Sequence, residues 1–244
     1  MASDRDIVRP VTERYRYCTV RPLYGLVFIT PMLIAFQVGT AYYYGTGLLA
    51  THHLRRVLEY FGASAAFLPA VLVATTLFVQ HLTRKDPWKL RGEVFAGMLG
   101  ESVLWMCPLG VMMGLAGRLQ AGEAGNGFLN GVLQAFGAGI YEEFLFRLLL
   151  IGLVLVVFVD VFRLKKDAVL IGAIVLAGLA FSMYHLSGEE ISQFPHLPWP
   201  EVIFRAAAGI YLGALFILRG FGITVGAHAF YNIYAIIASQ PLNA

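Results

Sequence analysis

The stretch GAGIYEEFLFRLLLIGLVLVVFVD, residues 137–160, is a long apolar run that contains two adjacent glutamates and an arginine. About 20 mostly apolar residues are enough for an α-helix to cross the hydrocarbon core of a bilayer. A charged side chain at the centre of such a helix costs roughly 2.5–3.5 kcal/mol in insertion measurements, so it usually faces other helices and marks a site. The stretch therefore predicts a membrane-spanning helix with a polar, inward-facing side.

The composition extends this prediction to the whole chain. Of its 244 residues, 58% are hydrophobic and only 14% are charged, and the mean hydropathy is +0.69. A soluble domain carries about 25% charged residues. We predict an all-α, polytopic membrane bundle of about seven transmembrane helices, with six to eight compatible with the pattern. The expected spans are 22–44, 61–82, 93–117, 127–162, 167–187, 201–218 and 221–240.

The fourth span is too long for one perpendicular crossing at about 1.5 Å per residue. We expect it to tilt, to project from the bilayer, or to break near Gly137 and Gly139. No internal repeat is visible, so residues 22–244 are predicted to form a single transmembrane domain. Residues 1–21 form a basic N-terminal arm without the apolar core of a secretory signal peptide.

The distribution of Lys and Arg predicts the orientation. Alternate connections carry five in the arm, four at 83–92, three at 163–166 and Arg219, thirteen in all, whereas the other connections carry three. Cytoplasmic loops collect Lys and Arg, so we expect a multi-pass protein of the plasma membrane with a cytoplasmic N-terminus. An outside C-terminus follows only if the number of spans is odd. The small net charge of +3 argues against a nucleic-acid partner, and the two cysteines indicate no disulfide framework.

The segment EEFLFR holds the first polar set. Glu143 and Arg147 are four residues apart with the acid first, the favourable order for an ion pair on a helix. Glu142 projects about 100° away around the axis. A carboxylate that is desolvated and not paired makes a usable base near neutral pH. The alternative is that all three groups form an ion cluster that braces neighbouring helices.

Two further segments place polar residues at helical spacing. Phe181 and His185 in FSMYHL are four residues apart, as are His228 and Asn232 in GAHAFYN. Taken alone, His185 could be an interfacial residue, and a His–Asn pair can hydrogen-bond between helices as packing. Taken together with the glutamates, the three sets supply a base, a proton carrier and hydrogen-bond donors.

That combination suits the activation of water against a carbonyl group. Glu142, helped by His185, would take a proton from water, and His228 and Asn232 would donate hydrogen bonds to the oxygen that gains negative charge. No serine or cysteine is placed beside these groups as a nucleophile. The spans as drawn put His185 near the outer end of its helix and His228 near the inner end of its own, several turns apart in depth.

The three segments match EExxxR, FxxxH and HxxxN, in that order. In this the chain resembles the CPBP family, which comprises CAAX-type prenyl proteases and bacteriocin-processing or immunity proteins. The resemblance covers a protease-like core at about 127–240 and implies an intramembrane glutamic endopeptidase. It implies a water-activating pair, an oxyanion hole and a supporting pair, which here are Glu142 with His185, His228 with Asn232, and Glu143 with Arg147. One departure is Leu148, where many members have glycine.

The resemblance implies a membrane-associated protein or peptide as substrate, for CAAX-type members a prenylated one, and membrane lipid as surroundings. Glu142 and the two histidines could also form a His₂Glu zinc site. No HExxH is present. Because His228 and Asn232 at i,i+4 suit paired donation, and because the resemblance favours it, we expect hydrolysis without a cofactor or metal. A non-catalytic immunity or scaffold protein and a proton-coupled transporter remain open, since intramembrane Glu, His and Arg also mark proton relays. The segment 188–200 could cover the site or simply connect two helices.

Overall fold

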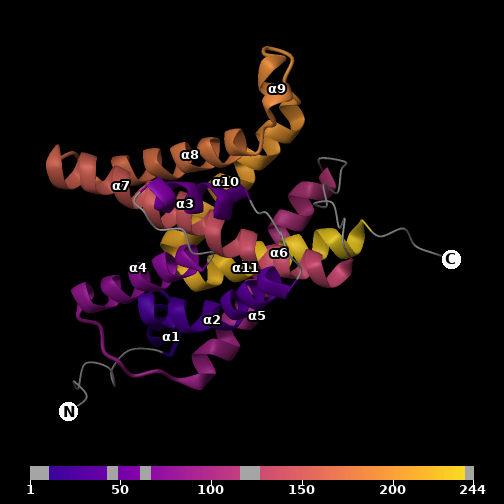
Figure 1. Ribbon diagram of the computed structural model, residues 1–244. Coiled ribbons are helices and arrows are strands. Elements are labelled where there is room, and N and C mark those ends of the chain that lie inside the picture. The colour runs from indigo at the N-terminus through magenta and orange to yellow at the C-terminus, as the bar shows by residue number, and fades with distance from the viewer. Residues whose placement is uncertain (1–10, 43–48, 61–66, 116–126, 240–244) are drawn as a thin grey trace.

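The computed structural model describes residues 11–42, 49–60, 67–115 and 127–239 (Figure 1). Within these ranges every regular element is a helix, which confirms the all-α prediction. Six helices of the described chain are long and apolar enough to cross a membrane. They are α2 (Pro22–Tyr42), α5 (Gly92–Leu115), the continuous helix Phe128–Val161, α8 (Lys166–Tyr184), α10 (Trp199–Arg219) and α11 (Phe221–Ala238).

The remaining predicted span corresponds to α4 (Leu68–Arg84), which has 17 residues. Its length of about 26 Å falls slightly short of a typical hydrocarbon core of about 30 Å. It nevertheless returns the chain beside the start of α2, because Arg84 Nη1 donates a hydrogen bond to the Val20 carbonyl oxygen at 3.3 Å. The described chain therefore begins at one end of the bundle and finishes at the opposite end (Figure 1).

The long fourth helix does not break at Gly137 or Gly139, so that alternative is wrong. It runs without interruption through α6 (Phe128–Glu143), the π-helical segment η2 (Phe144–Ile151), α7 (Gly152–Leu155) and a second π-helical segment, η3 (Val156–Val161). The first widening begins directly after the two glutamates. Single π-helical turns are frequent at functional sites.

Glycines set the closest helix contacts, as is usual in membranes, where small residues let backbones approach. A Cβ at Gly139 of α6 would lie 3.0 Å from the Val225 carbonyl oxygen of α11. A Cβ at Gly178 of α8 would lie 2.7 Å from the Ile210 nitrogen of α10. These contacts draw α6 to α11 and α8 to α10, and the predicted site residues lie on α6, on the η2 segment that continues it, at the end of α8 and on α11.

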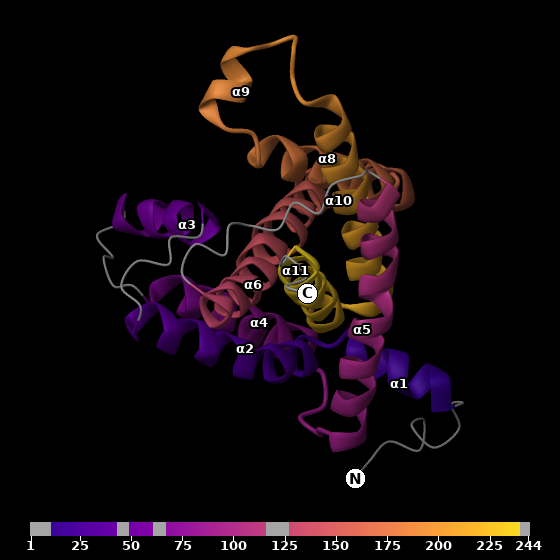
Figure 2. The ribbon, with the colours of Figure 1, turned by 90° about the vertical axis from the view of Figure 1, so that its right-hand side faces the viewer.

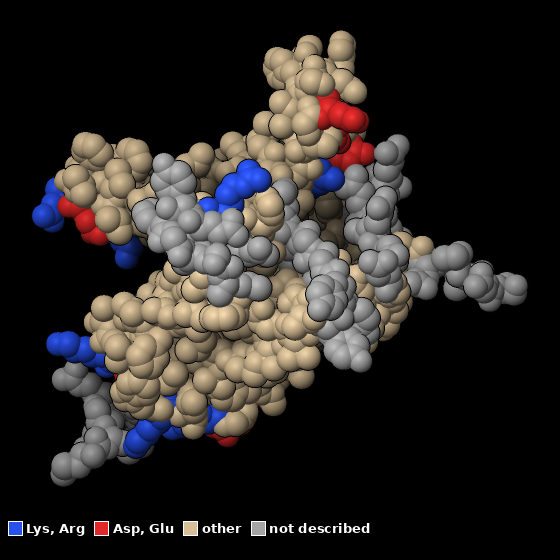
Figure 3. Space-filling view, in the orientation of Figure 1, with Lys and Arg blue, Asp and Glu red and all other residues tan. Residues whose placement is uncertain are grey.

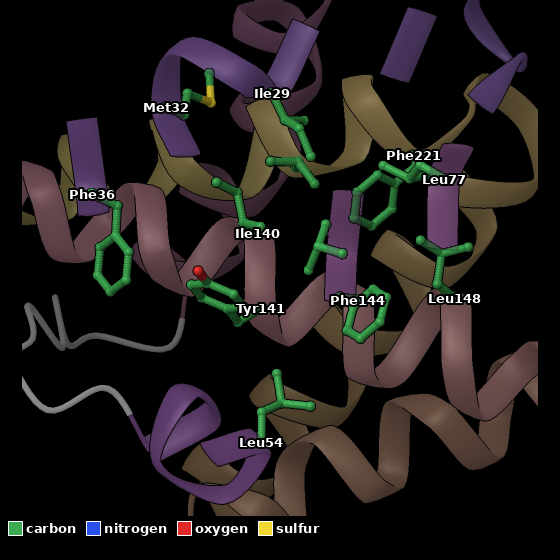
Figure 4. Packing of buried hydrophobic residues seen from close by; sticks show 12 residues of the cluster. Ile29, Met32, Phe36, Leu54, Leu77, Ile140, Tyr141, Phe144, Leu148 and Phe221 are labelled. Atoms are coloured by element: carbon green, nitrogen blue, oxygen red, sulfur yellow. The ribbon is translucent and has the colours of Figure 1, made fainter. Parts of the chain in front are cut away.

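The largest apolar cluster lies between α2, α4, the α6–η2 helix and α11 (Figure 4). Leu148 is buried in this cluster, so the residue that departs from the family pattern fills the core. The cluster also contains Ile29, Met32, Phe36, Leu77, Ile140, Tyr141, Phe144 and Phe221.

Helices α1 and α3 lie outside the predicted spans. Helix α1 (Val11–Thr19) forms within the basic arm and packs Cys18 into a cluster with α2, α5 and α11. Helix α3 (Leu49–Tyr60) buries Leu54 against Tyr141 and Phe144 of the α6–η2 helix (Figure 4). The segment between α2 and α4 is therefore partly helical and docked on the bundle.

The connection between α8 and α10 contains the short helix α9 (Gly188–Ser192) and projects beyond the ends of both helices (Figure 2). Its start is a capping box in which the Ser187 hydroxyl accepts from the Glu190 backbone and the Glu190 carboxylate accepts from the Ser187 backbone. The hydrogen bonds from the Ser187 backbone and side chain hold the pKa of Glu190 below its usual value. The segment stands away from α6 and α11.

Candidate active site

Glu142, near the end of α6, is the point at which the predicted residues converge. Its Oε2 atom lies 3.7 Å from His185 Nε2 and 3.8 Å from His228 Nε2. The carboxylate is buried. Both distances exceed a direct hydrogen bond, and polar groups at such separations are commonly joined through one water molecule.

The orientation of His185 follows from its place at the C-terminal end of α8. Its Nδ1 atom lies 2.8 Å from the Phe181 carbonyl oxygen, and its ring lies 4.6 Å from the Phe181 ring. A carbonyl oxygen only accepts, so Nδ1 carries the proton in this hydrogen bond. In the neutral ring, Nε2 then presents a lone pair toward Glu142. The four-residue spacing of Phe181 and His185 thus fixes the tautomer.

His228 is oriented by the second glutamate. Its Nδ1 atom lies 2.7 Å from Glu143 Oε1, and since the ionised carboxylate accepts, Nδ1 is protonated. The opposite nitrogen, Nε2, faces Glu142. With Nδ1 protonated, Nε2 can donate a hydrogen bond only when the ring is an imidazolium.

Arg147 supports this arrangement from η2. Its Nε atom lies 3.0 Å from Glu143 Oε2, and both side chains are fully buried. Its Nη2 donates to the Gly209 carbonyl oxygen of α10 at 3.0 Å, and its guanidinium carbon lies 5.0 Å from the Phe181 ring centre. A buried charge is costly unless it is paired. Glu143 is the buried partner of the Arg147 guanidinium.

Asn232 lies one turn beyond His228 on α11 and is half-buried. The i,i+4 spacing puts the amide on the same face as the imidazole. No residue in the described part of the chain forms a hydrogen bond with its side chain. The amide is therefore available as a donor beside His228.

The three sequence segments thus meet in space, although the predicted spans separated two of them in depth. The C-terminal end of α8 lies beside the middle of α11 (Figure 1). This arrangement brings His185 close to His228. Two acidic groups of another predicted span lie elsewhere, whereas Arg205 Nη1 donates to the His185 carbonyl oxygen at 3.3 Å. Glu101 pairs with Arg219 at 2.6 Å, and Glu93 is exposed near Arg91 at 3.8 Å.

Sequence reasoning missed one pair beside the site. His53 Nδ1 of α3 lies 2.8 Å from the Tyr184 hydroxyl, and Tyr184 precedes His185 in the chain. The available signal was the run LATHHLRRVLEY at 49–60, in which Leu54 and its apolar neighbours recur at helical spacing.

Among the residues described, no group of three or more His, Cys, Asp or Glu side chains is arranged to hold a metal ion. Hydrolysis without a metal stays a prediction, because a metal ion can bring its own ligand side chains together when it binds.

Residues 124–234 match a family model described as Type II CAAX prenyl endopeptidase Rce1-like. The matched range contains all three sequence segments and the whole of the Glu142 site. No curated protein and no solved structure matches the chain. The similarity to a family of CAAX prenyl endopeptidases therefore covers the part of the chain that carries Glu142, His185 and His228.

Proposed function

We propose that the protein hydrolyses a peptide bond of a membrane-associated, CAAX-type prenylated protein by means of a water molecule activated by Glu142 and His185. The observation that carries this proposal is the convergence of two imidazole nitrogens, from α8 and α11, on one oxygen of Glu142. A buried carboxylate flanked by a neutral imidazole and a potential imidazolium is suited to general-base catalysis.

In the proposed reaction, Glu142 takes a proton from the water molecule while Nε2 of His185 accepts its second hydrogen bond. The oxygen of the water attacks the carbonyl carbon, and the carbonyl electron pair moves onto oxygen. His228 Nε2–H and the Asn232 amide donate to this oxyanion. When the carbon–nitrogen bond breaks, the leaving amine takes the proton held by Glu142, and the carboxylate is regenerated.

Glu143 and Arg147 act through His228 in this scheme. Glu143 holds the Nδ1 proton of His228 at 2.7 Å and stabilises the imidazolium that an oxyanion donor requires. Arg147 keeps Glu143 ionised and in place at 3.0 Å. Each oxyanion donor in such a dry, preorganised site is worth about 10²–10³-fold in rate.

A cleavage assay tests the proposal. The purified protein in lipid vesicles is given an internally quenched peptide with a farnesylated cysteine followed by Val-Ile-Met. Cleavage should fall about 10²- to 10⁴-fold in Glu142→Gln and His185→Gln, because each removes a group that handles the water proton. Glu93→Gln, which alters an exposed glutamate of another predicted membrane helix, should leave cleavage unchanged. Full activity in both site variants would refute the mechanism.

The same assay tests metal dependence. We expect cleavage to persist after incubation with a strong zinc chelator such as 1,10-phenanthroline, because the scheme uses only side chains of the chain itself. Loss of activity that added zinc restores would show instead that Glu142 and the histidines act as metal ligands.

A further inference from the structure

Helix α3 makes a polar contact with α8, one of the helices that carry the predicted site. His53 Nδ1 and the Tyr184 hydroxyl are 2.8 Å apart, with their rings 5.3 Å apart at 80°. Leu54, the next residue on α3, is 5% exposed and packs into the main apolar cluster. Burial of Leu54 accounts for the docking of α3, whereas an exposed hydrogen bond between neutral groups adds little to stability. The polar pair therefore calls for a different explanation.

Tyr184 borders the proposed reaction centre. Its ring lies 5.9 Å from the His185 ring and 5.4 Å from the Phe146 ring. Tyr184 directly precedes His185, whose Nε2 atom lies 3.7 Å from Glu142 Oε2. The tyrosine thus lies on the α8 side of Glu142, while His228 and Asn232 approach from α11.

A peptide substrate brings backbone N–H and C=O groups into this site, and each needs a partner once it leaves water. His228 and Asn232 are assigned to the reacting carbonyl group. The backbone next to the scissile bond on the α8 side needs another partner. A tyrosine hydroxyl can both donate and accept a hydrogen bond. When an imidazole nitrogen takes up one of these roles, the direction in which the hydroxyl can make its other hydrogen bond is set.

We propose that the Tyr184 hydroxyl binds the backbone of the substrate peptide beside the scissile bond, and that His53 of α3 positions this hydroxyl through Nδ1. The inference rests on the proposed function. It makes Tyr184 a substrate-binding residue and His53 a positioning residue. Helix α3, which carries none of the predicted catalytic residues, thereby takes part in substrate recognition.

Steady-state kinetics with the farnesylated, quenched peptide test the assignment. Tyr184→Phe should raise KM about 3- to 10-fold, the usual effect of one hydrogen bond, and leave kcat within about twofold, because binding is lost equally in the ground and transition states. His53→Ala should raise KM by a similar or smaller factor. His53→Asn should restore the wild-type value, since an amide can occupy the position of Nδ1.

A double-mutant cycle separates positioning from independent effects. If His53 acts only through Tyr184, the double variant should have the KM of Tyr184→Phe alone. Tyr211→Phe is the matched control, because it removes a hydroxyl that donates to the Trp105 carbonyl oxygen at 2.8 Å, away from the site. It should leave KM unchanged.

Three outcomes would overturn the inference. An unchanged KM in Tyr184→Phe would exclude substrate contact, and additive losses in the double variant would exclude positioning by His53. If Tyr184→Phe fails to fold, an unchanged KM in His53→Ala, at an exposed position, would exclude the pair. Cleavage that is sensitive to Glu142→Gln but indifferent to these variants would refute this inference alone, whereas no cleavage by the wild type would refute the proposed function and the inference with it.

Discussion

At the scale of single residues, Glu143 decides whether His228 can serve as an oxyanion donor. Replacement of Glu143 by Gln removes the carboxylate that accepts the Nδ1 proton of His228 at 2.7 Å, so the ring loses the bond that fixes its tautomer and orientation. We expect kcat to fall about 10²-fold, the effect of losing one oxyanion donor, and KM to change much less.

Glu143→Asp is the control for this prediction, because it keeps a carboxylate that can accept from His228 and should lose less activity. The buried Arg147 also loses its partner in Glu143→Gln, so the melting temperature is measured alongside the kinetics. A fall in kcat that follows the fall in melting temperature across the two variants would show that Glu143 only braces the helices.

How much of the site could be predicted depended on the distance along the chain. The i,i+4 rule predicted the contact between Glu143 and Arg147, and the structure confirms it at 3.0 Å. The bond between Glu143 and His228 joins residues 85 positions apart and depends on the close packing of α6 on α11. Helical spacing carries no information on such a contact, nor on the pairing of His53 with Tyr184.

At the scale of elements, the crossing of α8 and α10 holds His185 in place. A side chain at Gly178 would meet the Ile210 nitrogen at 2.7 Å and the Ala206 carbonyl oxygen at 2.9 Å, and backbone atoms cannot rotate away. Gly178→Leu should therefore push α8 from α10. We expect a lower melting temperature, with destabilisation of about 1–3 kcal/mol, and a loss of cleavage as His185 moves from Glu142.

Gly172→Leu provides a matched control on the same helix, since nothing lies within 4 Å of a Cβ built there. It should leave both melting temperature and cleavage near wild type. Equal melting temperatures for the two variants would mean that α8 and α10 do not depend on close approach at Gly178.

The elements themselves were predicted unevenly, for a physical reason. Hydropathy responds to long apolar runs, so it located the helices around Glu142, His185 and His228. It is insensitive to α3, whose contact with the bundle rests on few apolar side chains such as Leu54. It is equally insensitive to the π-helical turns after Glu143, because those depend on backbone packing against neighbouring helices.

At the scale of the whole molecule, the stagger of helices brings the site together. The prediction from sequence assumed that every helix crosses the membrane at the same depth, and it placed His185 and His228 several turns apart. In the structure α8 ends beside the middle of α11 (Figure 1). Hydropathy gives the length of each span but not its shift along the membrane normal, which is set by contacts such as those at Gly139 and Gly178.

The distribution of charged residues predicts how the protein is oriented in the membrane. On the face shown in Figure 3, most Lys and Arg lie at the end that carries α1 and the α4–α5 and η3–α8 connections. The acidic residues of α9 lie toward the other end. Cytoplasmic segments are enriched in Lys and Arg, so the basic end should face the cytoplasm.

Cysteine labelling tests this orientation in a chain with Cys18→Ala and Cys107→Ser. Lys89→Cys lies in the exposed α4–α5 connection, and Ser239→Cys lies at the far end of α11. A membrane-impermeant maleimide should label the former only after the cells are opened and the latter from outside. Reversed labelling would overturn the orientation. Labelling of both from one side would mean that one of the five long apolar helices between the two positions, which are α5, the α6–η3 helix, α8, α10 and α11, does not carry the chain across.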